Sequence, residues 1–207
     1  MESNNSFLLP PSYLAPIGYY AVLLQIENCE TEQYEHFVKQ SIRNRCDIYG
    51  ANGKLTLSIP KQRKASSKTQ IKDIKIAYHH PWQKEHWKSI CSAYRSSAYF
   101  EFYEDLFIHF YEKRETFLLD FNLKLQEVIF KCLQIKDTSI LTQSYQKQST
   151  SNDYRNVTFQ IKNQTKYHQV FENKCGFISN LSTIDLLFNK GPESADYLNN
   201  LDIRIEI

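Results

Sequence analysis

Residues 7–24 read FLLPPSYLAPIGYYAVLL and predict a strand, a loop and a helix, in that order. The apolar run at residues 7–9 has the length of a short strand. The prolines at positions 10, 11 and 16 stiffen the loop, because each proline ring fixes its own φ. Pro16 fits a first helical turn, where backbone N–H groups have no partner within the helix. We therefore expect a buried helix over residues 17–24 and a loop that holds Tyr13 over a pocket.

The pair Asn52-Gly53 predicts a β-hairpin, because this dipeptide favours the tight turn that joins two antiparallel strands. It lies between the strand-like residues 46–49 and 55–59, and an extended stretch of mixed polarity precedes it over residues 29–48. Residues 61–72 are basic and contain serine, which is typical of a solvated loop. We expect a further strand over residues 71–76.

Apolar periodicity then predicts a group of helices that are rich in aromatic side chains. Pro81 opens the first, over residues 82–94, where Trp82, His86 and Ile90 share one face. A second helix is expected over residues 99–111 and a third over 117–133. The third has an apolar stripe formed by Leu118, Phe121, Leu125, Val128 and Cys132. The helix over residues 82–94 is expected to be largely buried.

The chain becomes more polar over residues 142–169, where strand-like alternation is confined to residues 157–161. This segment is either a lid or a long polar connection. Apolar residues return in a predicted helix over residues 181–188, with Asn180 or Ser182 as its cap. Gly191-Pro192 is expected to end that helix.

These elements favour an α/β fold. Its mixed sheet would contain the N-terminal strand, the central hairpin and the strand over residues 71–76, with the aromatic-rich helices covering it. The alternative is an α+β arrangement with segregated helices. A length of 207 residues fits a single domain over residues 1–207.

The amino-acid composition excludes several classes of binding partner and cofactor. The net charge is +2 and the charged fraction 23%, which gives no general attraction to nucleic acid or to an anionic membrane. The cysteines number five, with no CxxC pair and no histidine cluster beside them, so we predict neither a metal site nor another cofactor. No apolar run approaches the roughly 18 residues of a membrane span, and no signal-peptide pattern is present. The prediction is a cytoplasmic protein.

A set of short motifs resembles the WbqC-like protein family over nearly the whole chain. They are Pro11-Ser12-Tyr13-Leu14 with Gly18-Tyr19-Tyr20, Arg43-Asn44-Arg45 with Ile48, Trp82-x3-His86, and Gly191-Pro192-Glu193 with Tyr197-Leu198. The resemblance implies a role in bacterial surface-polysaccharide (O-antigen) gene clusters. Many relatives have His-Gln-Pro where this chain has Leu9-Pro10-Pro11, so a role of that histidine does not transfer.

The segment Arg43-Asn44-Arg45, with Lys39 shortly before it, is the best candidate for binding an anion. Guanidinium groups bind phosphate or carboxylate with two parallel hydrogen bonds. The alternative is a solvated strand edge, but Asn44-Arg45 falls where the resemblance places an Asn-Arg pair. We predict that Arg43 and Arg45 bind the anionic part of a substrate, and that Asn44 and Tyr13 orient a sugar.

His86 is the predicted proton acceptor, because a partly buried histidine titrates near neutral pH. It can equally be a core histidine with both ring nitrogens satisfied. Gly191 would contribute a backbone N–H at a helix N-terminus, and Glu193 a second acid or base. A simple helix-stop turn explains Gly191-Pro192 equally well, and a carboxylate there would repel phosphate.

The predicted function is an enzyme that modifies a nucleotide-linked or amino sugar, by acyl or aminoacyl transfer. Its substrate would be an anionic small molecule, with neither nucleic acid nor a membrane span involved. The alternative is a non-catalytic binding or scaffold protein of the same pathway, with a protein partner. The absence of a complete catalytic set in the sequence supports that alternative.

Overall fold

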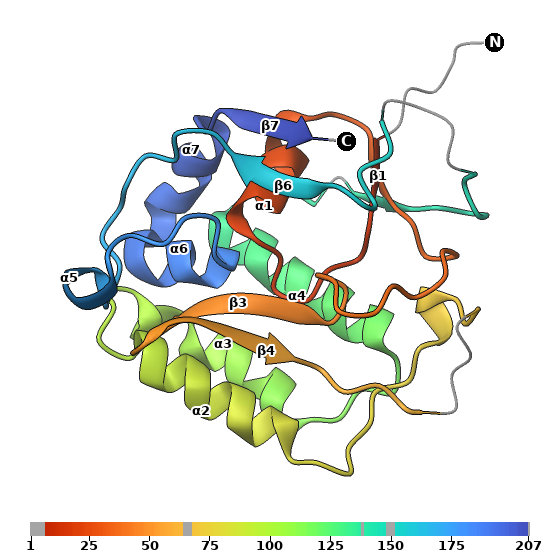
Figure 1. Ribbon diagram of the computed structural model, residues 1–207, viewed down its shortest axis with the longest axis horizontal. Coiled ribbons are helices and arrows are strands. Elements are labelled where there is room, and N and C mark those ends of the chain that lie inside the picture. Colours follow the sequence, from red (N-terminus) through yellow and green to blue (C-terminus); the bar gives the residue numbers. More distant parts are fainter. Residues whose placement is uncertain (1–6, 64–67, 138, 148–151, 207) are drawn as a thin grey trace.

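The computed structural model describes residues 7–63, 68–137, 139–147 and 152–206, and shows the mixed α/β architecture that the sequence predicts (Figure 1). The strands are β1 (Phe7–Leu9), β2 (Cys29–Thr31), β3 (Arg45–Gly50), β4 (Gly53–Ser58), β5 (Ile140–Leu141), β6 (Thr158–Ile161) and β7 (Ile203–Glu206). The α-helices are α1 (Ile17–Gln25), α2 (Trp82–Tyr94), α3 (Phe100–Glu112), α4 (Leu118–Leu133), α5 (Glu172–Cys175), α6 (Thr183–Lys190) and α7 (Ser194–Asn199). Short 3₁₀ turns are η1 (Ile71–Asp73) and η2 (Gly191–Glu193).

The predicted strand, loop and helix at the start of the chain are confirmed as β1 and α1. Their continuation is β2, which pairs in parallel with β1, and β5 pairs in parallel with β2 on its other side. Asp153 also forms a parallel bridge with Leu8. The carboxyl ends of these strands therefore face one edge, where the loops beginning at Pro10, Glu32 and Thr142 emerge.

The predicted hairpin is confirmed as β3 and β4, but it forms a two-stranded sheet of its own. The expected strand over residues 71–76 is wrong. Ile71 and Ile74 are both buried and lie three residues apart, a spacing that suits the three-residue turn of η1. After that turn, Lys75 and Ile76 make only isolated bridges, to Phe117 and Lys61. The parallel sheet and the hairpin thus stay separate.

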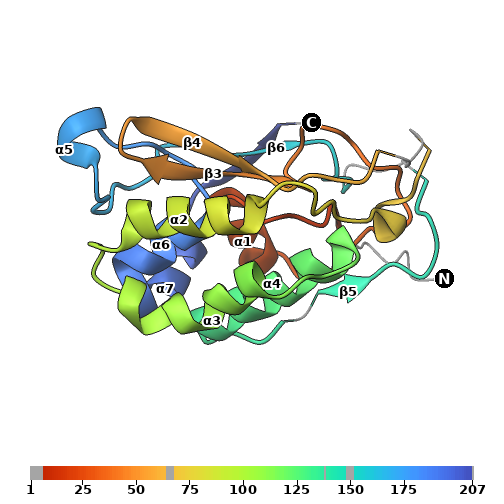
Figure 2. The ribbon, with the colours of Figure 1, turned by 90° about the horizontal axis from the view of Figure 1, so that it is seen from below.

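Figure 2 shows the hairpin and β6 on one side of a layer that contains α1, α2 and α6, with α3 and α4 on the other side. Aromatic side chains fill the space between the helices. The ring of Phe188 on α6 lies 5.3 Å from that of Tyr94, 5.2 Å from Phe100 and 5.6 Å from Phe107, measured between centroids. The predicted stripe on α4 is buried, except for a half-buried Val128.

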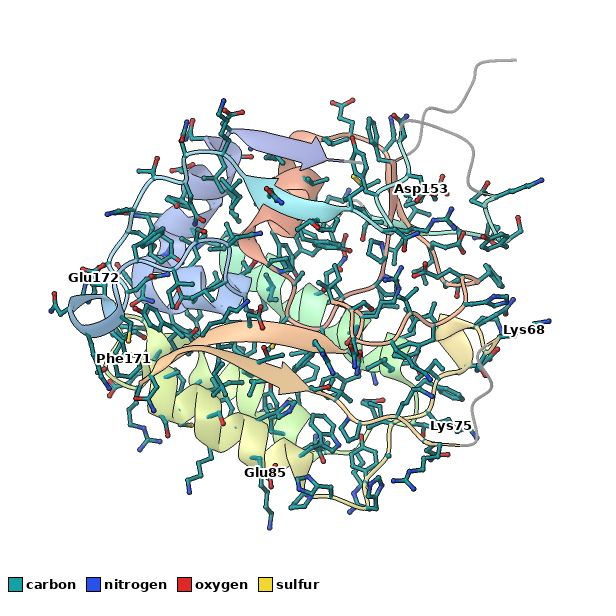
Figure 3. The ribbon with its side chains drawn as sticks, viewed as in Figure 1. Lys68, Lys75, Glu85, Asp153, Phe171 and Glu172 are labelled. Carbon is teal, nitrogen blue, oxygen red and sulfur yellow. The ribbon has the colours of Figure 1, made fainter. Side chains whose placement is uncertain are left out.

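The polar residues 142–169 contain β6, close to the predicted strand over residues 157–161. The start of this segment is tied to the carboxyl edge of the parallel sheet through Glu32. The Glu32 carboxylate accepts hydrogen bonds from the Thr142 hydroxyl at 3.0 Å and from the Gln146 backbone N–H at 2.8 Å. Figure 3 shows Asp153 beside β1, so the chain returns to this same region. The part of the predicted lid at residues 148–151 lies outside the described residues.

Candidate functional site

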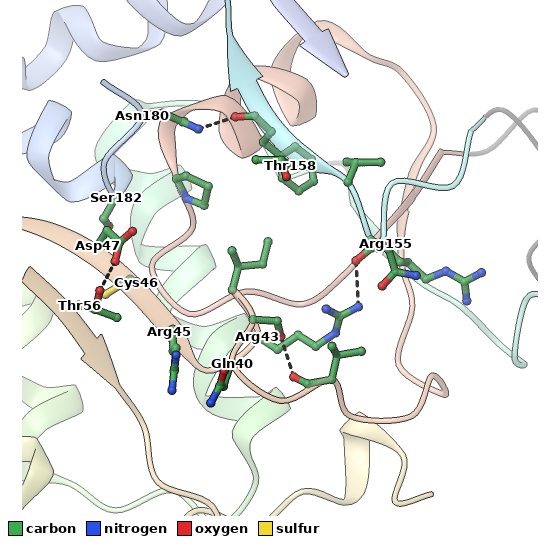
Figure 4. Close-up of a pocket in the computed structure, with 17 residues that line it drawn as sticks. Gln40, Arg43, Arg45, Cys46, Asp47, Thr56, Arg155, Thr158, Asn180 and Ser182 are labelled. Carbon is green, nitrogen blue, oxygen red and sulfur yellow. Dashed lines mark hydrogen bonds between the residues drawn. The ribbon is translucent and has the colours of Figure 1, made fainter. Parts of the chain in front are cut away.

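A cavity of about 510 Å³ lies beside strand β3, and we call it the Arg45 cavity (Figure 4). Its wall comes from four separate parts of the chain: Pro16, the hairpin region (Val38, residues 40–43 and 45–47, and Thr56), residues 155–159, and Asn180 with Ser182. The N-terminal loop, the hairpin and the end of the polar segment therefore meet here. Such a concave, largely preformed hollow is the usual shape of a small-molecule site.

Arg45 is the member of this wall with an unmatched charge. Strand β3 places it on the same face as Asp47, because side chains of a strand alternate between faces. Its guanidinium has no carboxylate within ion-pair distance in the described part of the chain, and its Nε is buried without a hydrogen-bond partner there. An anion bound here would supply that partner.

Arg43 also lines the cavity, but its charge is already matched. The side chain is 2% exposed, and its Nε and Nη2 donate to the two carboxylate oxygens of Glu35 at 2.6 and 2.7 Å. Nη2 also donates to the carbonyl of Arg155 at 3.0 Å, as Figure 4 shows. Burial raises the pKa of Glu35, although Arg43 acts against this shift. Arg43 therefore has a structural role, because its hydrogen bonds connect Glu35 and Arg155 across the wall of the cavity.

Arg155, which is not among the residues predicted from the sequence, lies next to Arg43 in this wall. Its Nε donates to Asp153 at 2.8 Å, and its Nη1 lies 3.5 Å from the Glu32 carboxylate. Burial favours a protonated Asp153, but the hydrogen bonds from Arg155 outweigh burial and lower the pKa of that carboxyl. The available signal was the pair of opposite charges two residues apart, Asp153 and Arg155, inside an otherwise uncharged stretch.

Further polar groups complete the cavity. Gln40, Asn156 and Thr158 lie in its wall, and their side chains make no hydrogen bond to another described residue. Asp47 accepts a hydrogen bond from the Thr56 hydroxyl at 2.5 Å and pairs with Lys54 at 3.1 Å. These groups can bind the hydroxyls of a sugar next to an anion at Arg45.

Cys46 lies in the wall as well. Burial raises the pKa of its thiol well above the ordinary value, with a further contribution from Asp47. A thiol that keeps its proton is a poor nucleophile, so Cys46 fits a structural role.

His86 and Tyr13 form a buried network away from this cavity. The Tyr13 hydroxyl lies 2.9 Å from His86 Nδ1 and 3.0 Å from the Tyr111 hydroxyl. Tyr13 is fully buried, so the expectation that its loop holds it over a pocket is wrong. Burial lowers the pKa of His86 to about 4, partly offset by a hydrogen bond with the Ser58 backbone. The expectation that His86 titrates near neutral pH is therefore also wrong.

The expected contact between Trp82 and His86 is confirmed, with ring centroids 5.0 Å apart in an edge-on arrangement. Their position on α2 places both in the wall of a second cavity, beside strand β4. At neutral pH the imidazole is uncharged, and its Nδ1 is hydrogen-bonded to the Tyr13 hydroxyl. This geometry corresponds to the core histidine considered as the alternative.

The remaining predicted residues lie outside the Arg45 cavity. Asn44 is buried, and its Nδ2 donates to the Ile59 carbonyl at 2.9 Å, while Lys39 is exposed. Gly191 ends α6 as predicted, with φ of 57°, and packs so closely on Tyr99 that an added Cβ would lie 2.5 Å from the ring. Glu193 is exposed and pairs with Lys190 at 2.8 Å. The structure thus brings Arg43 and Arg45 together, but not with His86, Gly191 or Glu193.

Comparison with known proteins completes this description. In the described residues no helix has the length and apolar character needed to cross a membrane. Neither a curated protein nor a solved structure matches the chain. The model of the WbqC-like protein family matches residues 10–158 and 152–197, which include the whole wall of the Arg45 cavity. The chain therefore belongs to the WbqC-like protein family.

Proposed function

We propose that this protein binds an anionic, nucleotide-linked sugar in the Arg45 cavity and modifies that sugar in bacterial surface-polysaccharide biosynthesis. The family is associated with polysaccharide biosynthesis loci, and this supports the pathway. The substrate class is supported by the cavity itself, where an arginine lies among groups suited to sugar hydroxyls. The proposed location of the protein is the cytoplasm, where nucleotide-linked sugars are made.

The observation that carries the proposal is the unmatched guanidinium of Arg45. Arg43 and Arg155 have carboxylate partners at 2.6 and 2.5 Å, so their charges are largely neutralised. Arg45 has none among the described residues, and phosphate is a strong partner for such a group. Asp47, close to it on β3, is the carboxylate of the wall and can accept a proton from a sugar hydroxyl or amine.

Calorimetric titration with UDP-glucose tests this assignment. A charge-assisted hydrogen bond contributes about 1.5–3 kcal/mol, so Arg45→Gln should weaken binding roughly tenfold to a hundredfold. Arg95→Gln is the matched control, because Arg95 is exposed at the end of α2 and outside the cavity. Equal affinity of wild type and Arg45→Gln, or no binding at all, would contradict the proposal.

A non-catalytic binding protein of the same pathway is the second candidate. It is favoured by the fact that His86 and Glu193, the predicted proton-transfer groups, do not reach the Arg45 cavity. Incubation of the protein with UDP-sugars and acyl donors, followed by mass spectrometry, separates the two functions. Turnover that Asp47→Asn abolishes supports the enzyme, whereas tight binding without any new product supports the binding protein.

A further inference from the structure

A second cavity, also of about 510 Å³, lies on the other side of strand β4, and we call it the His80 cavity. Its wall consists of residues 56–58 of β4 with Pro60, the loop residues His79 and His80, and the first two turns of α2. Figure 3 shows Glu85, one of its members, at the start of α2. Apart from Thr56, the residues that line this cavity differ from those that line the Arg45 cavity.

The two cavities share Thr56. In the hairpin register Arg45 pairs with Ser58, and Asp47 pairs with Thr56. Paired side chains of antiparallel strands point to the same face, with Cβ atoms about 5 Å apart. The β3 members of these pairs border the Arg45 cavity, and the β4 members border the His80 cavity. Ligands in the two cavities would therefore lie on one face of the hairpin, separated by little more than the Thr56 side chain.

The two walls differ in charge. Three arginines and Asp47 line the Arg45 cavity, whereas the described wall of the His80 cavity contains no arginine or lysine and one acidic residue, Glu85. The other polar groups there are the hydroxyls of Thr56, Ser58 and Ser89, and imidazoles. Such a wall suits a ligand that is uncharged or carries an amine, and it offers nothing to bind phosphate strongly.

The unpartnered indole N–H of Trp82 is evidence for a ligand in the His80 cavity. Its side chain is 2% exposed and lines the cavity, and its indole N–H has no acceptor among the residues described. Most buried polar groups in proteins are hydrogen-bonded, so an unpartnered donor in a cavity wall indicates a missing acceptor.

The histidine and glutamate side chains around the His80 cavity are not arranged as metal ligands in the described residues. His79, His80, Glu85 and His86 surround the cavity, but across the described ranges no three such residues converge as metal ligands would. The His80 imidazole lies 3.3 Å from Glu85, and Tyr13 occupies Nδ1 of His86.

We infer that the His80 cavity binds a second ligand, an uncharged or amine-bearing sugar, directly beside the anionic ligand of the Arg45 cavity. The choice of a sugar rests on the proposed function, whereas the adjacency of the two cavities rests on the hairpin register alone. The two bound molecules would then lie side by side on one face of the hairpin, with the Thr56 side chain between them.

Histidine-labelled protein makes the inference testable by NMR, because the six histidines report on different regions. His79, His80 and His86 line this cavity, and His36, His109 and His168 do not. Glucose and glucosamine at millimolar concentration and constant pH should shift the ring resonances of His79 and His80, and leave those of His36, His109 and His168 in place. Saturation with UDP-glucose should change the half-saturating sugar concentration at least twofold.

Variants of α2 provide the control. Ser89→Leu fills the cavity and should weaken the sugar-dependent shifts at least tenfold. Ser92→Leu, exposed one turn further along the same helix, should leave them unchanged. Histidine shifts that are absent in the wild type, or identical in Ser89→Leu, would overturn the inference. If UDP-glucose still binds through Arg45 in that case, only the second site is refuted. Sugar binding without Arg45-dependent binding of UDP-glucose would refute the proposed function instead.

Discussion

Substitution of Asp185 tests how burial in this core changes the pKa of a carboxyl group and thereby the stability of the fold. The side chain is fully buried at the start of α6, where its Oδ2 accepts hydrogen bonds from the Tyr167 hydroxyl and from Gln169 Nε2. No cation pairs with it among the described residues. Burial raises the pKa of Asp185 from 3.8 to about 6, and the hydrogen bonds from Tyr167, Gln169 and Tyr94 act against the shift.

The sign of the stability effect follows from that pKa. The folded protein holds the Asp185 proton more tightly than the unfolded chain, so the stabilisation is complete below pH 3.8 and is lost as pH rises through about 6. One pKa unit corresponds to about 1.36 kcal/mol, so the loss between pH 4 and pH 7.5 is roughly 2.5 kcal/mol. Asp185→Asn has nearly the same shape and does not titrate.

Urea unfolding of wild type and Asp185→Asn, followed by tryptophan fluorescence from pH 4 to pH 7.5, measures the effect. The unfolding free energy of the variant should rise relative to that of the wild type by roughly 2.5 kcal/mol over this range, because all other groups titrate in both proteins. Asp196→Asn makes the same substitution at an exposed position on α7 and is the control for effects that do not depend on burial. A constant or falling difference for Asp185→Asn would refute the idea that burial dominates at this carboxyl.

Two further substitutions test the stability of the fold, one beside the Arg45 cavity and one at the end of α6. Glu35→Gln leaves the buried guanidinium of Arg43 without its counter-charge and should lower the unfolding free energy by about 3–5 kcal/mol in urea titrations. A loss below about 1 kcal/mol would mean that water or another group already serves Arg43. Gly191→Ala combines a left-handed φ with a Cβ 2.5 Å from the Tyr99 ring, and should cost about 2–4 kcal/mol. An unchanged melting temperature would show that Tyr99 moves aside freely.

The sequence predicted local elements well where one physical rule decided them. Asn52-Gly53 specified the hairpin because only a tight turn suits that pair between two strands. Gly191 ended α6 because its φ of 57° suits glycine. The spacing of apolar residues predicted α2, α3 and α4 within a residue or so of their ends. It misassigned residues 71–76, since buried isoleucines at positions 71 and 74 fit a 3₁₀ turn as well as a strand.

The candidate site was only partly predictable, because long-range contacts decided the state of each side chain. Arg43 and Arg45 are neighbours of the same type, yet Glu35 neutralises only the first. Arg155 reaches the cavity from a distant polar segment whose composition resembles a loop. His86 lies on the predicted helix face, but its low pKa comes from burial, and Tyr13, which hydrogen-bonds its Nδ1, belongs to a distant part of the chain. Periodicity within one helix carries no information about such partners.

The contact between Arg43 and the Arg155 carbonyl has a consequence for the kinetics of ligand capture. It joins Arg43 to Arg155, two residues of the cavity wall that come from distant parts of the chain. Glu35 holds the same guanidinium through two hydrogen bonds, so these two parts of the wall are already joined before any molecule arrives. A rigid, already open receptor loses little conformational entropy on association. Uptake of ligand should therefore follow a single encounter step whose rate rises linearly with concentration, without the plateau that a slow opening motion would impose.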